Sequence, residues 1–153
     1  MEQVVFGRWR LCCDREATRR AYDCIKIGGP EACGCCYCRN FAAARGQVYP
    51  AEVRALFEDL GIDFTKEAEV YEMCRLESGL RLYGGWFHCI GRIEAEGEEV
   101  GKFDLEGGTG PFNLYFHDKP NLVSECFQGS PLLQLEFNAQ VPWVLQEPEP
   151  DGV

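Results

Sequence analysis

Apolar residues follow a helical spacing near the middle of the chain. Between residues 50 and 60 they fall at positions i, i+3, i+4 and i+7, which places them on one face of a helix. They are Val53, Leu56, Phe57 and Leu60. Pro50 suits the first turn of a helix, and Gly61 suits the position just after its end. The pattern therefore predicts a helix over residues 50–60 with one buried face.

From residue 69 onward the apolar residues recur at every second position, as they do in half-buried strands. Segments rich in glycine and proline separate the extended stretches, and the pair Gly84-Gly85 inside one of them indicates a bulge. The expected strands cover residues 69–76, 80–93, 100–105, 112–116 and 132–137. Short strands joined by turns predict a mainly antiparallel sheet or a small sandwich, so the expected fold class is α+β.

The N-terminal part carries weaker signals of local structure. Extended stretches are expected over residues 4–11 and 22–27, paired as a hairpin, with a helical turn over residues 14–20 that Asp14 caps. A short alanine-rich helix is expected over residues 39–45, directly after a knuckle of cysteines. This part should therefore form the cysteine-rich edge of the domain.

The length of 153 residues is typical of one domain. We expect a single domain over residues 1–146, with a cysteine-rich part (1–46) and a helix and sheet part (47–146), followed by a flexible acidic tail (147–153). No apolar stretch approaches the ~20 residues that a membrane-spanning helix needs. The sequence therefore predicts a globular protein that does not cross a membrane.

The net charge of −10 is distributed unevenly. Residues 1–46 hold eight Lys/Arg and five Asp/Glu, whereas residues 47–153 hold seven and twenty. An acidic surface repels phosphates, which argues against a nucleic-acid partner and favours a basic protein partner. The first ten residues lack the basic and apolar regions of a secretion signal, so a cytoplasmic location is expected, where thiols stay reduced.

Four of the ten cysteines lie within six residues, in the segment Cys33-Gly34-Cys35-Cys36-Tyr37-Cys38. In a reducing compartment such a cluster indicates first a metal site, with a redox dithiol, an iron–sulfur centre or unmetallated thiols as alternatives. A zinc ion takes four thiolate or imidazole ligands in a tetrahedron. So short a segment supplies three of them without strain, and a fourth must come from elsewhere in the chain.

Cys24 is the nearest candidate for the fourth ligand, because it lies near the end of an expected strand that turns back at Gly28-Gly29. The rival candidates are Cys12, Cys13, His88 and Cys89. Adjacent residues on a strand point to opposite faces, so at most one member of each adjacent pair can reach the cluster.

Three segments of the chain together resemble a family of small bacterial proteins of unknown function. They are Cys33-Gly34-Cys35-Cys36-Tyr37-Cys38-Arg39-Asn40-Phe41, Tyr83-Gly84-Gly85-Trp86-Phe87-His88 and Val141-Pro142-Trp143-Val144-Leu145. The resemblance implies a C-x-C-x-x-C core with Cys36 incidental, and it implies no activity. The expected metal ligands are therefore Cys24, Cys33, Cys35 and Cys38, whereas Cys36, Cys74 and Cys126 should tolerate exchange.

The leading functional hypothesis is a non-catalytic binding or regulatory protein, stapled by structural Zn²⁺, whose acidic surface meets a basic protein partner. Neither of the two histidines, His88 and His117, forms a recognisable nucleophile–base pair with a cysteine, so no catalytic residue is assigned. The enzyme alternative is a thiol redox protein with Cys35 as nucleophile and Cys38 as resolving thiol. An iron–sulfur protein is a further alternative.

Overall fold

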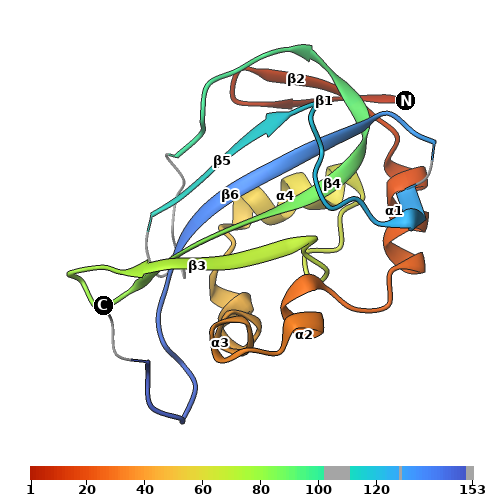
Figure 1. Ribbon diagram of the computed structural model, residues 1–153. Coiled ribbons are helices and arrows are strands. Elements are labelled where there is room, and N and C mark those ends of the chain that lie inside the picture. The colour runs from red at the N-terminus through yellow and green to blue at the C-terminus, as the bar shows by residue number, and fades with distance from the viewer. Residues whose placement is uncertain (102–110, 128, 151–153) are drawn as a thin grey trace.

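The computed structural model describes residues 1–101, 111–127 and 129–150, and within them it confirms the α+β class (Figure 1). The strands are β1 (Glu2–Phe6), β2 (Trp9–Cys13), β3 (Glu69–Arg75), β4 (Arg81–Ala95), β5 (Phe112–His117) and β6 (Leu132–Val141). The helices are α1 (Arg15–Cys24), α2 (Gly29–Cys33), α3 (Cys36–Ala44) and α4 (Ala51–Leu60), with 3₁₀ turns η1 (Arg45–Gln47) and η2 (Glu125–Phe127).

The described strands form one antiparallel sheet in the order β1-β2-β4-β6-β5, and β3 pairs with β4 on the edge that β2 also uses. The register shifts between Glu72 and Cys74 in β3, so the bulge lies in β3, opposite Tyr83 and Leu82, and not at the glycine pair that was expected to form it. Gly85 instead allows close packing, because a Cβ atom there would lie 2.6 Å from the carbonyl oxygen of Glu69.

Strand β4 pairs with β3 and with β2 along the same edge, and helix α1 occupies the gap between β3 and β2. The Tyr22 hydroxyl accepts a hydrogen bond from the backbone N–H of His88 (3.1 Å) and donates one to its carbonyl oxygen (2.8 Å). The Thr18 hydroxyl accepts from the N–H of Ile90 (2.9 Å). Buried backbone groups need partners, so these side chains replace a missing strand.

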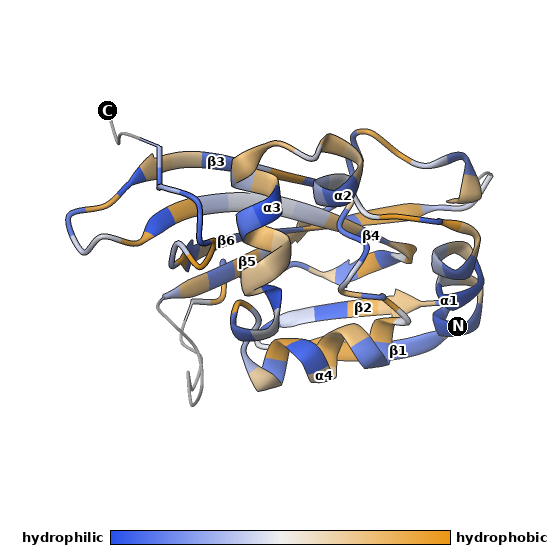
Figure 2. Cartoon of the chain, turned by 90° about the horizontal axis from the view of Figure 1, so that it is seen from below, coloured by the Kyte–Doolittle hydropathy of each residue, from blue (hydrophilic) through white to orange (hydrophobic). Residues whose placement is uncertain are grey.

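The core lies between the sheet and α3 and α4 (Figure 2). The predicted helix over residues 50–60 is confirmed as α4, and its four apolar residues are all buried. Phe57 of α4 meets Phe87 of β4 with ring centroids 4.8 Å apart, and Tyr49 contacts both rings. These aromatic contacts fix α4 against the centre of the sheet.

Three expectations for local structure need revision. Residues 22–27 do not form a strand: residues 22–24 are the last turn of α1, which begins after the predicted Asp14 cap, and residues 25–27 belong to no regular element. The stretch 4–11 is divided by a turn at Gly7 (φ 59°) into β1 and β2, which pair with each other. Of the strand expected over residues 100–105, Val100 forms an isolated bridge to Leu114, and residues 102–110 lie outside the described part.

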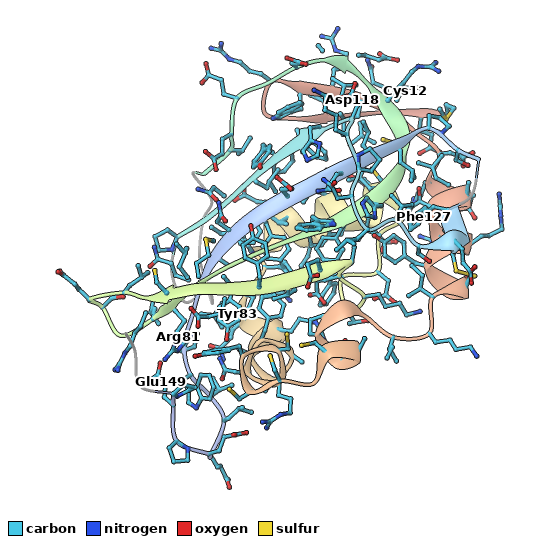
Figure 3. The ribbon with its side chains drawn as sticks, viewed as in Figure 1. Cys12, Arg81, Tyr83, Asp118, Phe127 and Glu149 are labelled. Carbon is cyan, nitrogen blue, oxygen red and sulfur yellow. A yellow bond between two sulfur atoms is a disulfide. The ribbon has the colours of Figure 1, made fainter. Side chains whose placement is uncertain are left out.

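The end of the chain contacts the domain through Arg81, whose side chain is 2% exposed. Its guanidinium donates to the carboxylate of Glu149 (2.8 Å), the carboxylate of Glu72 (3.1 Å) and the carbonyl oxygen of Pro150 (2.7 Å). Figure 3 shows Arg81 and Glu149 side by side next to Tyr83. Residues 147–150 of the expected flexible tail are therefore packed, and residues 151–153 lie outside the described part.

Candidate metal centre

The structure brings three of the four predicted ligands together. The Sγ atoms of Cys33, Cys35 and Cys38 all lie within 4.8 Å of one another. Cys33 and Cys35 are exposed, whereas Cys38 is buried. Within a tetrahedral zinc–thiolate site with Zn–S distances of ~2.3 Å, sulfurs lie ~3.8 Å apart, so small side-chain adjustments bring all three onto one ion. These residues can hold a metal ion.

The arrangement follows from the local chain geometry. Helix α2 ends at Cys33, and Gly34 adopts the left-handed conformation (φ 70°) that reverses the chain directly after it. Cys35 is the N-cap of α3, and its Sγ accepts a hydrogen bond from the backbone N–H of Cys38 (3.5 Å). A short turn between two helices thus presents three sulfurs at the N-terminus of α3, where the helix dipole favours negative charge.

The local environment shifts the pKa values of Cys35 and Cys38 in opposite directions. Partial burial opposes ionisation of Cys35, but hydrogen bonds from the backbone N–H of Cys38 and from the neighbouring thiols outweigh it and lower the pKa of Cys35. Burial, reinforced by the hydrogen bonds and negative charge of Cys35 and Cys33, raises the pKa of Cys38. Of these two thiols, Cys35 therefore ionises more readily than Cys38.

A buried ion-pair network fixes α2 relative to α3 and so positions the sulfurs. Arg45, directly after α3, contacts the carboxylate of Glu67 (2.7 and 3.0 Å) and the carboxylate of Glu31 in α2 (2.6 Å). The Tyr49 hydroxyl donates a further bond to Glu67 (2.7 Å). Burial raises the pKa of Glu67 against the opposing effect of Arg45 and Tyr49. The side chain of Glu67 is fully buried, so these partners are needed to hold its charge.

The prediction that Cys24 is a ligand is wrong. Cys24 is joined to Cys126 by a disulfide that links the end of α1 to η2, and a disulfide sulfur is not a thiolate ligand. The helical conformation of residues 22–24, rather than the expected strand, directs Cys24 toward η2. The same bond shows that Cys126 has a structural partner, so the expectation that it tolerates exchange must be revised.

The rival ligands lie in the sheet, away from the cluster. Cys12 and Cys13 belong to β2, and His88 and Cys89 belong to β4. The thiols of Cys13 and Cys89 hydrogen-bond to each other, which lowers the pKa of Cys13 and raises that of Cys89. Among the described residues, no fourth ligand therefore joins the three sulfurs.

His88 has a structural role, as a satisfied residue of the sheet. It is 1% exposed, and its Nε2 atom lies 3.0 Å from the side-chain oxygen of Gln134. Burial lowers the pKa of His88, and the hydrogen bond with Gln134 only partly offsets this effect. The imidazole is therefore held neutral in the folded protein more strongly than in the unfolded chain.

We expect this difference to destabilise the protein in acid. The unfolded histidine, with a pKa of about 6.5, takes up a proton more readily than the folded one, so His88 reduces the free energy of unfolding as the pH falls below that value. The test is urea unfolding of the wild type and of His88→Gln at about pH 7.5 and about pH 5. Both proteins contain the same carboxylates, so the difference between them reports the contribution of His88 to the free energy of unfolding. The advantage of the wild type over the variant should shrink in acid. An advantage that is equal at both pH values would contradict the prediction.

Sequence reasoning did not find the residues that support the cluster. Glu67 and Arg45 are separated by 22 positions, and neither stands in a recognisable motif. The only sequence signal is that residue 67 is an acid immediately before Ala68 and the alternating stretch that forms β3. Tertiary contacts of this kind leave no periodic pattern.

The described part of the chain contains no helix that is long and apolar enough to cross a membrane. Comparison with known proteins found no matching family model, no curated protein with significant similarity and no similar solved structure.

Proposed function

We propose that this protein is a non-catalytic binding protein in which Cys33, Cys35 and Cys38 hold one zinc ion. The observation that carries the proposal is the convergence of three sulfurs within 4.8 Å of one another where α2 ends and α3 begins. Thiolate ligands favour Zn²⁺ among the abundant divalent ions, because Mg²⁺ and Ca²⁺ prefer oxygen. The ion would join the end of α2 to the first turn of α3.

Three thiolates give the site its chemical character. Most catalytic zinc sites use mainly histidine and carboxylate ligands, whereas cysteine-rich ligand sets are typical of structural sites. Three negative sulfurs also exceed the charge of the ion, which weakens its ability to activate water. The fourth position would be occupied by water or by a ligand from outside the described part of the chain.

Metal analysis of purified protein tests this assignment. Protein produced with zinc supplied should contain about one Zn²⁺ per chain, and the double variant Cys35→Ser/Cys38→Ser should contain almost none. Cys36→Ser and Cys74→Ser are matched controls, because they remove free thiols outside the triplet and should leave the zinc content unchanged. A wild type without zinc, or a loss of zinc in Cys36→Ser, would contradict the assignment.

The same geometry supports one alternative, a thiol redox function. Cys35 at the N-cap of α3 and Cys38 one turn later have the arrangement of a nucleophilic and a resolving thiol. Such an enzyme, freed of metal, reduces a disulfide substrate such as insulin and loses that activity in Cys35→Ser. If the purified protein contains zinc and its metal-free form does not reduce insulin, the result would support the binding function over the redox function.

The proposed binding role also takes account of charge. The second part of the chain carries thirteen more acidic than basic side chains, from the twenty Asp/Glu and seven Lys/Arg of residues 47–153. Long-range attraction at such a surface speeds association with a basic protein and weakens as salt is added. We therefore propose a basic protein as the partner.

A further inference from the structure

The face of the sheet opposite α3 and α4 carries a row of aromatic and acidic side chains. Glu69 pairs with Trp86, Trp86 with Glu136, and Glu136 with Tyr115 across four neighbouring strands. Residues that pair directly across strands lie on the same face, so the four side chains form one row. Figure 1 shows this face toward the viewer, with α4 behind the sheet.

Tyr71 extends the row into an aromatic surface. Its ring centroid lies 6.2 Å from that of Trp86, and its phenol lies across Gly84, where a Cβ atom would come within 2.5 Å of the ring. Tyr71 is 44% exposed, and the adjacent Met73 is 43% exposed. The absence of a side chain at Gly84 thus lets an exposed tyrosine lie flat on the sheet.

The carboxylates of the row have no strong cation beside them. Glu136 accepts hydrogen bonds from the hydroxyl of Tyr115 and from the side-chain amide of Gln134 (2.9 Å), and lies 3.5 Å from His117. Glu69 accepts a bond from the backbone N–H of Val70 (3.0 Å). Among the described residues, no lysine or arginine forms an ion pair with either carboxylate.

The protein already uses this combination of groups to hold an arginine. The guanidinium carbon of Arg81 lies 5.2 Å from the ring centroid of Tyr37 and 5.7 Å from that of Trp143, and its nitrogens contact Glu72 and Glu149. A planar guanidinium stacks on aromatic rings and matches carboxylate oxygens, which an ammonium does less well. The row on the open face offers the same partners without an internal arginine.

We infer that the surface formed by Glu69, Tyr71, Trp86, Tyr115 and Glu136 binds an arginine side chain on an extended segment of a basic protein partner. The inference rests on the proposed binding role and is independent of the metal site. The net charge of −10 provides long-range attraction for such a segment, and the aromatic rings then select arginine over lysine.

Fluorescence anisotropy with a labelled peptide of alternating glycine and arginine tests the inference. The peptide should bind more tightly than its lysine counterpart, and Trp86→Leu and Glu136→Gln should each weaken binding by about two- to fivefold. Tyr71→Leu should act in the same direction, and because Tyr71 is exposed this variant should fold like the wild type. Glu96→Gln is the matched control, because it removes the same charge from an exposed site beyond the end of β4.

Three outcomes would overturn the inference. They are equal binding of the arginine and lysine peptides, an equal effect of Glu96→Gln and Glu136→Gln, and preferential binding of a single-stranded RNA that Trp86→Leu abolishes. A basic peptide that binds in a salt-sensitive manner without any effect of Trp86→Leu would reject this surface and leave the proposed binding role intact.

Discussion

Replacing Cys24 and Cys126 together with serine should lower the free energy of unfolding by about 2–5 kcal/mol. The disulfide joins positions 102 residues apart, so it removes much of the conformational freedom of the unfolded chain. It also holds η2 against α1, where the rings of Tyr22 and Phe127 meet edge to face at 5.5 Å. Phe127 is seen beside α1 in Figure 3.

Urea unfolding of the double variant measures this effect. The control is Cys12→Ser/Cys74→Ser, which removes two free thiols from the sheet and should change the free energy of unfolding much less. Equal losses in the two variants, or no loss in either, would contradict the disulfide as a stabilising bond.

The disulfide also bears on the predicted cytoplasmic location, because stable disulfides are rare in cytosolic proteins. Equilibration with glutathione buffers gives the reduction potential of the bond. A structural disulfide of a secreted protein typically has a reduction potential below about −300 mV and resists reduction by glutathione. A bond with a higher potential is labile and responds to the redox state of the cell.

The second large effect is expected at Glu67. Replacing this buried carboxylate by leucine leaves the Tyr49 hydroxyl without its acceptor and leaves Arg45 paired only with Glu31, so we expect a loss of about 3–5 kcal/mol. Thermal or urea unfolding measures the loss. Because the network fixes α2 to α3, zinc should also bind more weakly in Glu67→Leu.

A triple variant shows whether the loss of stability in Glu67→Leu comes from buried polar groups that are left without partners. Replacing the network as a whole, in Glu67→Leu/Arg45→Met/Tyr49→Phe, removes every buried group that the single change leaves unpaired, so the triple variant should be more stable than Glu67→Leu. A triple variant that is less stable than the single one would mean that each side chain contributes mainly by packing.

The sequence predicted those elements whose periodicity is local. The spacing in α4 and the alternation in β3, β4, β5 and β6 follow from which face of each element is buried. The buried face recurs at every third or fourth residue of a helix and at every second residue of a strand, so it can be recognised in the sequence. The prediction was wrong at residues 22–27, where Tyr22 is buried because its hydroxyl caps the edge of β4. That contact depends on a strand 66 residues away.

Of the candidate site, the sequence predicted only the three cysteines that lie close together along the chain. The close spacing of Cys33, Cys35 and Cys38 made a shared site foreseeable, because a short turn cannot separate its own side chains. The partner of Cys24 was not foreseeable, because ten cysteines allow many pairings and sequence does not select among them. The packing of Glu149 on Arg81 was missed for a similar reason, since the composition of an acidic, proline-rich segment suggests a free tail.

X-ray absorption at the zinc edge tests the three-thiolate centre most directly. Zinc-loaded protein should show three sulfur ligands at ~2.3 Å and one nitrogen or oxygen ligand at ~2.0–2.1 Å. Cys36→Ser should give the same spectrum as the wild type, whereas Cys35→Ser should lose sulfur scattering. A first shell without sulfur, or one in which Cys36→Ser changes the number of sulfur ligands, would contradict the assignment of the metal to Cys33, Cys35 and Cys38.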